Sequence, residues 1–71
     1  MLTDAQFQAL AQLLRLRPGP AQDAARLVMV QGMATPDAAR QVGMEYPDAH
    51  RSVKRVRTGL DLAKIAAGGS V

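Results

Sequence analysis

The chain has 71 residues, 48% of them hydrophobic but only 3% aromatic, and nine Lys and Arg against six Asp and Glu give a net charge of +3. A chain of this length is expected to form one small domain whose stability as a monomer is marginal. It contains no cysteine, which excludes disulfides and thiolate chemistry. We see no apolar run long enough to cross a bilayer and no secretory signal, so we expect a soluble cytoplasmic protein without a membrane partner.

The first part of the chain predicts two short helices. Thr3 and Gln6 form the pattern of a capping box, in which each side chain bonds to the backbone amide of the other residue. The first helix is expected over residues 4–16, before two prolines that flank a glycine. A second helix is expected from Pro20 to a left-handed turn at Gly32, and its role is structural.

A brief third helix and a glycine turn come next. Thr35 is the expected N-cap, because Pro36 then takes the first helical position. Gly43 allows a sharp turn, and Ala39 is small at the point where the two helices of a helix-turn-helix cross. We therefore predict a helix-turn-helix over residues 35–58.

The fourth helix is expected to restart at Pro47 with apolar and cationic residues on opposite sides. Its apolar stripe consists of Ala49, Ser52, Val53, Val56, Leu60, Ala63 and Ala67. Gly59 is the point at which this helix is expected to bend or stop. The whole chain is therefore predicted to be all-α, with a four-helix domain over residues 1–67 whose last helix is extended, and a loose tail over residues 68–71.

These residues resemble the KorA/TrfB family of plasmid-encoded transcriptional repressors. Residues 2–8 fit the LTxxQFQ opening of that family, and residues 25–32 fit an AR-x-VLV-x-G-like segment. The matching residues of the helix-turn-helix are Ala39, Gly43, Val53, Arg55 and Val56. The resemblance covers most of the chain up to about Asp61.

The resemblance implies a repressor that binds a palindromic operator in double-stranded DNA as a homodimer. Arg51 stands where the family has a base-reading Gln, and Arg55 keeps the family's base-reading Arg. Because Gln pairs best with adenine whereas Arg favours guanine, the preferred operator is expected to differ. Family members also carry a C-terminal dimerisation region, and only about a dozen residues follow the helix-turn-helix here. A different dimer contact is therefore expected.

The candidate DNA contacts lie in the second half of the chain. The candidates for base contacts are Arg51, Arg55, His50 and Lys54, and those for phosphate contacts are Thr35, Tyr46 and Arg57. A basic helix that follows a capped short helix and a glycine turn favours DNA contact, although the same cations can form an ordinary solvated surface. Thr35 can equally act only as a helix cap, and Tyr46 can simply cover the turn.

Three apolar residues after Gly59 are candidates for dimerisation: Leu60, Leu62 and Ile65. They can form a seam with a second copy, or they can fold back on the first helix. We favour the seam, because a palindrome reader needs a two-fold axis and a domain this small gains stability from a partner subunit.

Other classes of function have less support from the sequence. His50 is the only histidine and has no neighbouring ligand for a metal site, and no paired carboxylates or glycine-rich phosphate loop are present. We therefore expect no enzyme activity, no cofactor and no small-molecule substrate. The alternative is a protein-binding module, such as an antitoxin-like protein or a host-factor inhibitor, because acidic residues lie close to the predicted DNA side: Asp37, Glu45 and Asp48.

Overall fold

The computed structural model describes residues 2–68. Within these residues the chain forms four helices and no strand, namely α1 (Asp4–Leu13), α2 (Pro20–Met29), α3 (Thr35–Val42) and α4 (Tyr46–Gly68). The predicted all-α class and the long last helix are confirmed. In the part of the chain that is described, no helix is both long and apolar enough to cross a membrane.

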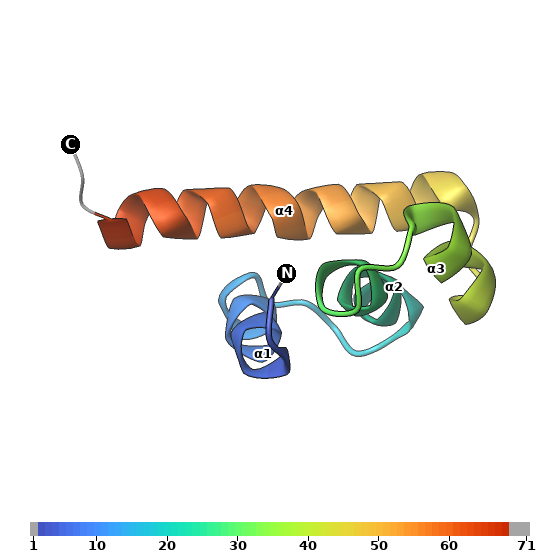
Figure 1. Ribbon diagram of the computed structural model, residues 1–71, viewed down its shortest axis with the longest axis horizontal. Coiled ribbons are helices and arrows are strands. Elements are labelled where there is room, and N and C mark those ends of the chain that lie inside the picture. The colour runs from blue at the N-terminus through green and yellow to red at the C-terminus, as the bar shows by residue number, and fades with distance from the viewer. Residues whose placement is uncertain (1, 69–71) are drawn as a thin grey trace.

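The long helix α4 organises the molecule. It runs along one edge of the molecule, and α1, α2 and α3 all lie on the same side of it (Figure 1). Its 23 residues span roughly 35 Å at 1.5 Å per residue, close to the 40 Å length of a molecule only 19 by 18 Å across. The second helix, α2, contacts each of the other three. Because the short helices share one side of α4, its opposite side is open to solvent.

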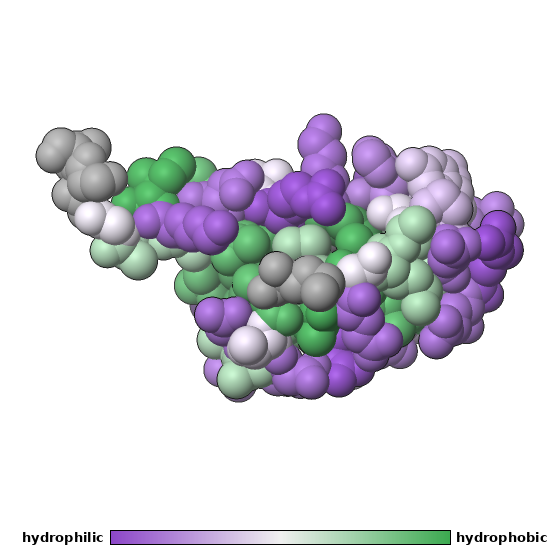
Figure 2. Space-filling model, viewed as in Figure 1, coloured by the Kyte–Doolittle hydropathy of each residue, from purple (hydrophilic) through white to green (hydrophobic). Residues whose placement is uncertain are grey.

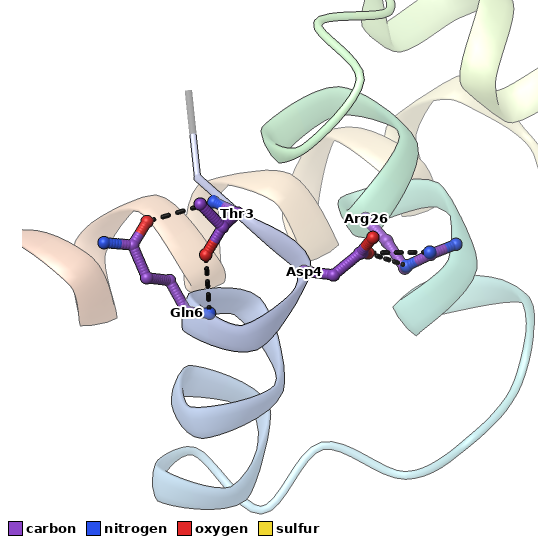
Figure 3. Close-up of polar contacts among 4 residues, drawn as sticks. All are labelled: Thr3, Asp4, Gln6 and Arg26. Carbon is purple, nitrogen blue, oxygen red and sulfur yellow. Dashed lines mark hydrogen bonds and ion pairs between the residues drawn. The ribbon is translucent and has the colours of Figure 1, made fainter.

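The start of α1 confirms the predicted capping box. The amide of Gln6 donates to Oγ1 of Thr3 at 3.1 Å, and the amide of Thr3 donates to Oε1 of Gln6 at 3.0 Å (Figure 3). Beside this cap, Asp4 pairs with Arg26 of α2, whose Nη2 lies 2.7 Å and whose Nε lies 2.9 Å from Oδ1 of Asp4. Both side chains are exposed, so the pair is expected to stabilise the fold only weakly.

The end of α1 differs from the prediction. The helix ends at Leu13 rather than at residue 16, before the two prolines are reached. The reason is a left-handed residue, Arg15, with φ of 55°. Its amide donates to the Gln12 carbonyl at 3.1 Å, and the Leu16 amide donates to the Ala11 carbonyl at 2.9 Å. This is the hydrogen-bond pattern of a Schellman motif, which usually has glycine at the left-handed position.

The start of α3 also corrects a prediction. Ala34 is the N-cap, with φ of −66° and ψ of 143°, and Thr35 is the first helical residue. No side chain caps this helix, so Thr35 is not the predicted cap. The prediction failed because the amides of the first helical turn have no partner within the helix, and proline is therefore tolerated at more than one position there. By contrast, α2 begins at Pro20 as predicted. It ends at Met29, earlier than predicted, and Gly32 has the expected positive φ of 74° in the turn that follows.

Two buried clusters form the core, and α4 contributes to both. The first contains Phe7, Leu10, Ala11, Ala25 and Val56. The second is almost entirely alanine and contains Ala24, Leu27, Ala38, Ala39 and Ala49. Such small side chains allow the helices to approach closely. The half-buried methionines fill the edges, with Met29 against the first cluster and Met33 and Met44 against the second.

The second half of α4 is straight where a break was predicted. The helix begins at Tyr46, one residue before Pro47, and continues through Gly59 to Gly68. Gly59 is buried, and a Cβ atom at this position would lie 2.6 Å from Cδ1 of Leu14. The glycine therefore allows α1 to approach the helix rather than ending it. Of the predicted tail, Gly68 belongs to α4, and residues 69–71 lie outside the described part of the chain.

Candidate nucleic-acid interface

The turn between α3 and α4 fixes the angle between these helices. Gly43 is left-handed, with φ of 75°. Its amide donates to the Arg40 carbonyl at 3.3 Å, and the Met44 amide donates to the Ala39 carbonyl at 2.9 Å. Ala39 and Ala49 are both buried in the cluster where the two helices pack. The predicted roles of the turn glycine and of the small residue before it are confirmed.

The open side of α4 carries the cations. The predicted base-contact residues are all exposed, namely His50, Arg51, Lys54 and Arg55. Arg57 and Thr58 are exposed as well. Hydrophilic surface extends along the outer edge of α4 and over the end of the molecule where α3 lies (Figure 2). A helix presented in this way fits the major groove of B-DNA, which is about 12 Å wide.

Two of the acidic residues are paired with arginines of their own helices. Asp48 pairs with Arg51 on α4, and Asp37 pairs with Arg40 on α3, each three residues apart. All four side chains are exposed, so a phosphate or a base edge can replace the carboxylate at small cost. Arg51 is therefore held near the start of α4, on its open side, by a contact that is easily exchanged.

Arg55 lies differently from Arg51. One of its terminal nitrogens, Nη2, donates to the backbone carbonyl of Leu14 at 3.0 Å. That carbonyl belongs to the C-cap residue of α1, so no later amide of the helix donates to it. The guanidinium is thus turned toward α1, at the edge of the open side, rather than straight outward.

The predicted phosphate contacts do not form one group. Tyr46 lies at the start of α4 and stacks on His50, with ring centroids 5.8 Å apart and an angle of 29° between the planes. Thr35 is half-buried in the first turn of α3. Arg57 is exposed, and among residues 2–68 it forms no ion pair. Only Tyr46 and Arg57 therefore share α4 with the base-contact candidates.

The predicted dimerisation residues separate into two kinds. Leu60 is half-buried and packs against the first core cluster, so it belongs to the fold of one chain. Leu62 and Ile65 are 62% and 65% exposed, and Leu13 of α1 is 64% exposed. Hydrophobic surface is visible toward the C-terminal end of α4, where the helix extends past α1 (Figure 2).

Residues 2–68 contain no group of three or more His, Cys, Asp or Glu side chains that could hold a metal ion. We compared the chain with known protein families, with curated proteins and with solved structures, and none of the three comparisons found a match. Function therefore has to be inferred from the geometry and charge of the site.

Proposed function

We propose that the protein is a sequence-specific, DNA-binding transcriptional repressor that binds a palindromic operator as a dimer. One observation carries this proposal: α3 and the turn at Gly43 brace a helix whose cationic side no other helix covers. In this proposal α4 enters the major groove, and α3 lies across the phosphate backbone. Occupation of a promoter then blocks transcription.

Arg51 is the main base-reading residue in this proposal. It lies on the open side of the first half of α4, and its exposed pair with Asp48 leaves it free to exchange partners. A guanidinium binds O6 and N7 of guanine with two hydrogen bonds, which contributes about 1–3 kcal/mol of discrimination. Lys54 and His50 lie on the same exposed helix and supply further contacts. Arg55 reads a base only if it leaves the Leu14 carbonyl.

Most of the affinity comes from phosphate contacts, which carry no sequence information. Arg57 and Tyr46 are exposed on α4 and are suited to this role. Thr35 lies in the first turn of α3, where backbone amides point outward and attract anions.

The dimer contact is assigned to the exposed end of α4. Leu62 and Ile65 lie three residues apart on the same side of the helix, and neither is covered by its own chain. If two copies pair antiparallel through these residues, Leu62 of one copy lies beside Ile65 of the other. The contact is then the same on both copies, as a two-fold interface requires.

Selection of bound sequences from a random pool of duplex DNA tests the proposal. The expected product is an inverted repeat whose half-sites are one or more helical turns apart, with guanine enriched opposite Arg51. A salt titration on the selected duplex and on random duplex follows, and both affinities are expected to fall steeply as salt rises. Indifference to every duplex at low salt would exclude this proposal and favour the protein-binding module.

A further inference from the structure

A cleft of about 410 Å³ lies where the connection between α1 and α2 meets the middle of α4. Arg15 and Arg17 line it from the connection, and Arg55 lines it from α4. All three side chains are exposed, and Ala25 and Val56, also in its lining, are buried. Among residues 2–68, no acidic residue lines the cleft, and none of the three cleft arginines forms an ion pair. The cleft therefore concentrates positive charge over an apolar base.

Arg15 occupies a backbone conformation that arginine rarely adopts. The same pattern of hydrogen bonds closes α1 at Arg15 and α3 at Gly43, and both residues are left-handed. At Gly43 the residue has no Cβ atom to strain, whereas at Arg15 the Cβ atom crowds the backbone. A strained residue with a charged side chain in a cleft points to a role for that side chain other than folding.

Arg55, which lines the cleft from α4, already has one hydrogen bond that orients its guanidinium. Its bond to the Leu14 carbonyl uses one N–H group of the guanidinium. The remaining N–H groups are available, and a guanidinium matches the oxygens of a phosphate with two parallel hydrogen bonds. A third cation, Arg17, comes from the connection itself, two residues after Arg15. Three arginines that line one cleft, one of them with an oriented guanidinium, are suited to a phosphate group.

We propose that the Arg15–Arg17–Arg55 cleft binds a phosphate group, and that in the complex with DNA it takes a phosphate of the backbone beside the groove that α4 enters. The assignment of this phosphate to the DNA backbone rests on the proposed function, in which Arg51 enters the groove. Arg55 lies one helical turn beyond Arg51 on α4. The site itself does not rest on the proposed function, since a free phosphate-bearing molecule has the same chemistry. The two sources are separated by experiment.

The first arm uses no DNA. Inorganic pyrophosphate is titrated into labelled protein, and the side-chain Nε–H signals of the arginines are followed by NMR. Saturable shifts are expected at Arg15, Arg17 and Arg55 and not at Arg26, which pairs with Asp4 at the other end of α1. Arg15→Gly is expected to weaken pyrophosphate binding at least threefold and, because glycine relieves the left-handed strain, to raise the Tm. Lower pyrophosphate affinity together with a higher Tm cannot be explained by damage to the fold.

The second arm measures duplex DNA. Arg15→Gln and Arg17→Gln are each expected to weaken binding to all duplexes alike and to lower the salt slope by about one unit, because each removes about one phosphate contact. Arg26→Gln is the matched control for the change in charge, and its slope is expected to stay unchanged. Normal DNA binding by both cleft variants would refute the assignment to the DNA backbone while leaving the proposed function intact.

The two arms together distinguish a failure of the proposed function from a failure of the phosphate-site assignment. If the wild-type protein binds no duplex but pyrophosphate still shifts the three arginines, the cleft is a site for a free phosphate-bearing molecule. If pyrophosphate shifts all exposed arginines equally and the cleft variants bind DNA normally, the cleft is not a phosphate site.

Discussion

Gly59 and Leu14 lie so close together that a Cβ atom on the glycine would be 2.6 Å from Cδ1 of the leucine. In an exposed helix, Gly→Ala would stabilise the protein by about 1 kcal/mol. Here we expect Gly59→Ala to destabilise it by about 1 kcal/mol, because the displacement of Leu14 outweighs the gain in helix propensity. Denaturant unfolding measures the difference.

Leu14→Ala provides the control for this prediction, since it removes the δ-methyl groups and keeps the carbonyl that binds Arg55. In that background Gly59→Ala should stabilise by about 1 kcal/mol, which corresponds to a coupling of about 2 kcal/mol between the two sites. Equal effects of Gly59→Ala in both backgrounds would mean that the contact carries no energy.

The same contact shows where prediction of the fold from the sequence stops. The capping box and the glycine turn were predictable, because residues a few positions apart determine them. Gly59 could not be interpreted in this way, because its neighbour Leu14 lies 45 residues earlier in the chain, as the difference between the two residue numbers shows. A glycine within a helical pattern indicates either a break or a close approach, and only the tertiary packing distinguishes them.

Two threonines that were both predicted as helix caps are expected to differ in their effect on stability. Thr3→Ala should destabilise the protein by about 1 kcal/mol, because Oγ1 accepts from the Gln6 amide. Thr35→Ala should cost less than about 0.5 kcal/mol, because Thr35 is already helical and caps nothing. Thermal unfolding of the two variants in parallel makes the comparison. A larger loss for Thr35→Ala would show that it caps α3 in solution.

Asp48 is expected to weaken DNA binding, because it pairs with Arg51 on the side of α4 that we propose faces DNA. Asp48→Asn should tighten binding to the selected operator roughly twofold to threefold, as expected for release from an exposed ion pair of about 0.5 kcal/mol. Asp37→Asn makes the same change in charge on α3 and releases Arg40 instead. Its effect should be smaller, and fluorescence anisotropy at fixed salt measures both. Weaker binding by Asp48→Asn would mean that the carboxylate positions Arg51 for its contact.

The candidate site could be predicted only in part. The exposure of Arg51 and Lys54 follows from the period of the apolar stripe on one helix, so the sequence alone was sufficient. The position of Arg55 depends on the Leu14 carbonyl, 41 residues away. The contribution of Arg15 depends on a left-handed residue where no glycine indicates one. The position of Arg55 arises from the packing of α1 on α4, which no local pattern specifies.

Arg51 and Arg57 are expected to affect DNA binding in different ways. Arg51→Ala should cost about 1–3 kcal/mol at one position of the operator half-site and relax base preference there. Arg57→Ala should weaken operator and random duplex equally and lower the salt slope by about one unit. Repeating the sequence selection with each variant, together with salt titrations, separates the two roles. An unchanged base preference for Arg51→Ala would show that another residue reads that position.

Leu62 and Ile65 are expected to stabilise the dimer without contributing to the stability of the single folded chain. Each is more than half exposed in the single chain, so Leu62→Asp or Ile65→Asp should leave the Tm of the dilute monomer nearly unchanged. Each should weaken dimerisation by about 1.5–3 kcal/mol, the free energy of burying one large aliphatic side chain. Sedimentation equilibrium over a range of concentrations measures the dissociation constant.

Leu60→Asp is the contrasting variant, because Leu60 packs against the first core cluster, and its main effect should be loss of stability. Unchanged dimerisation by both Leu62→Asp and Ile65→Asp would move the two-fold axis away from the end of α4.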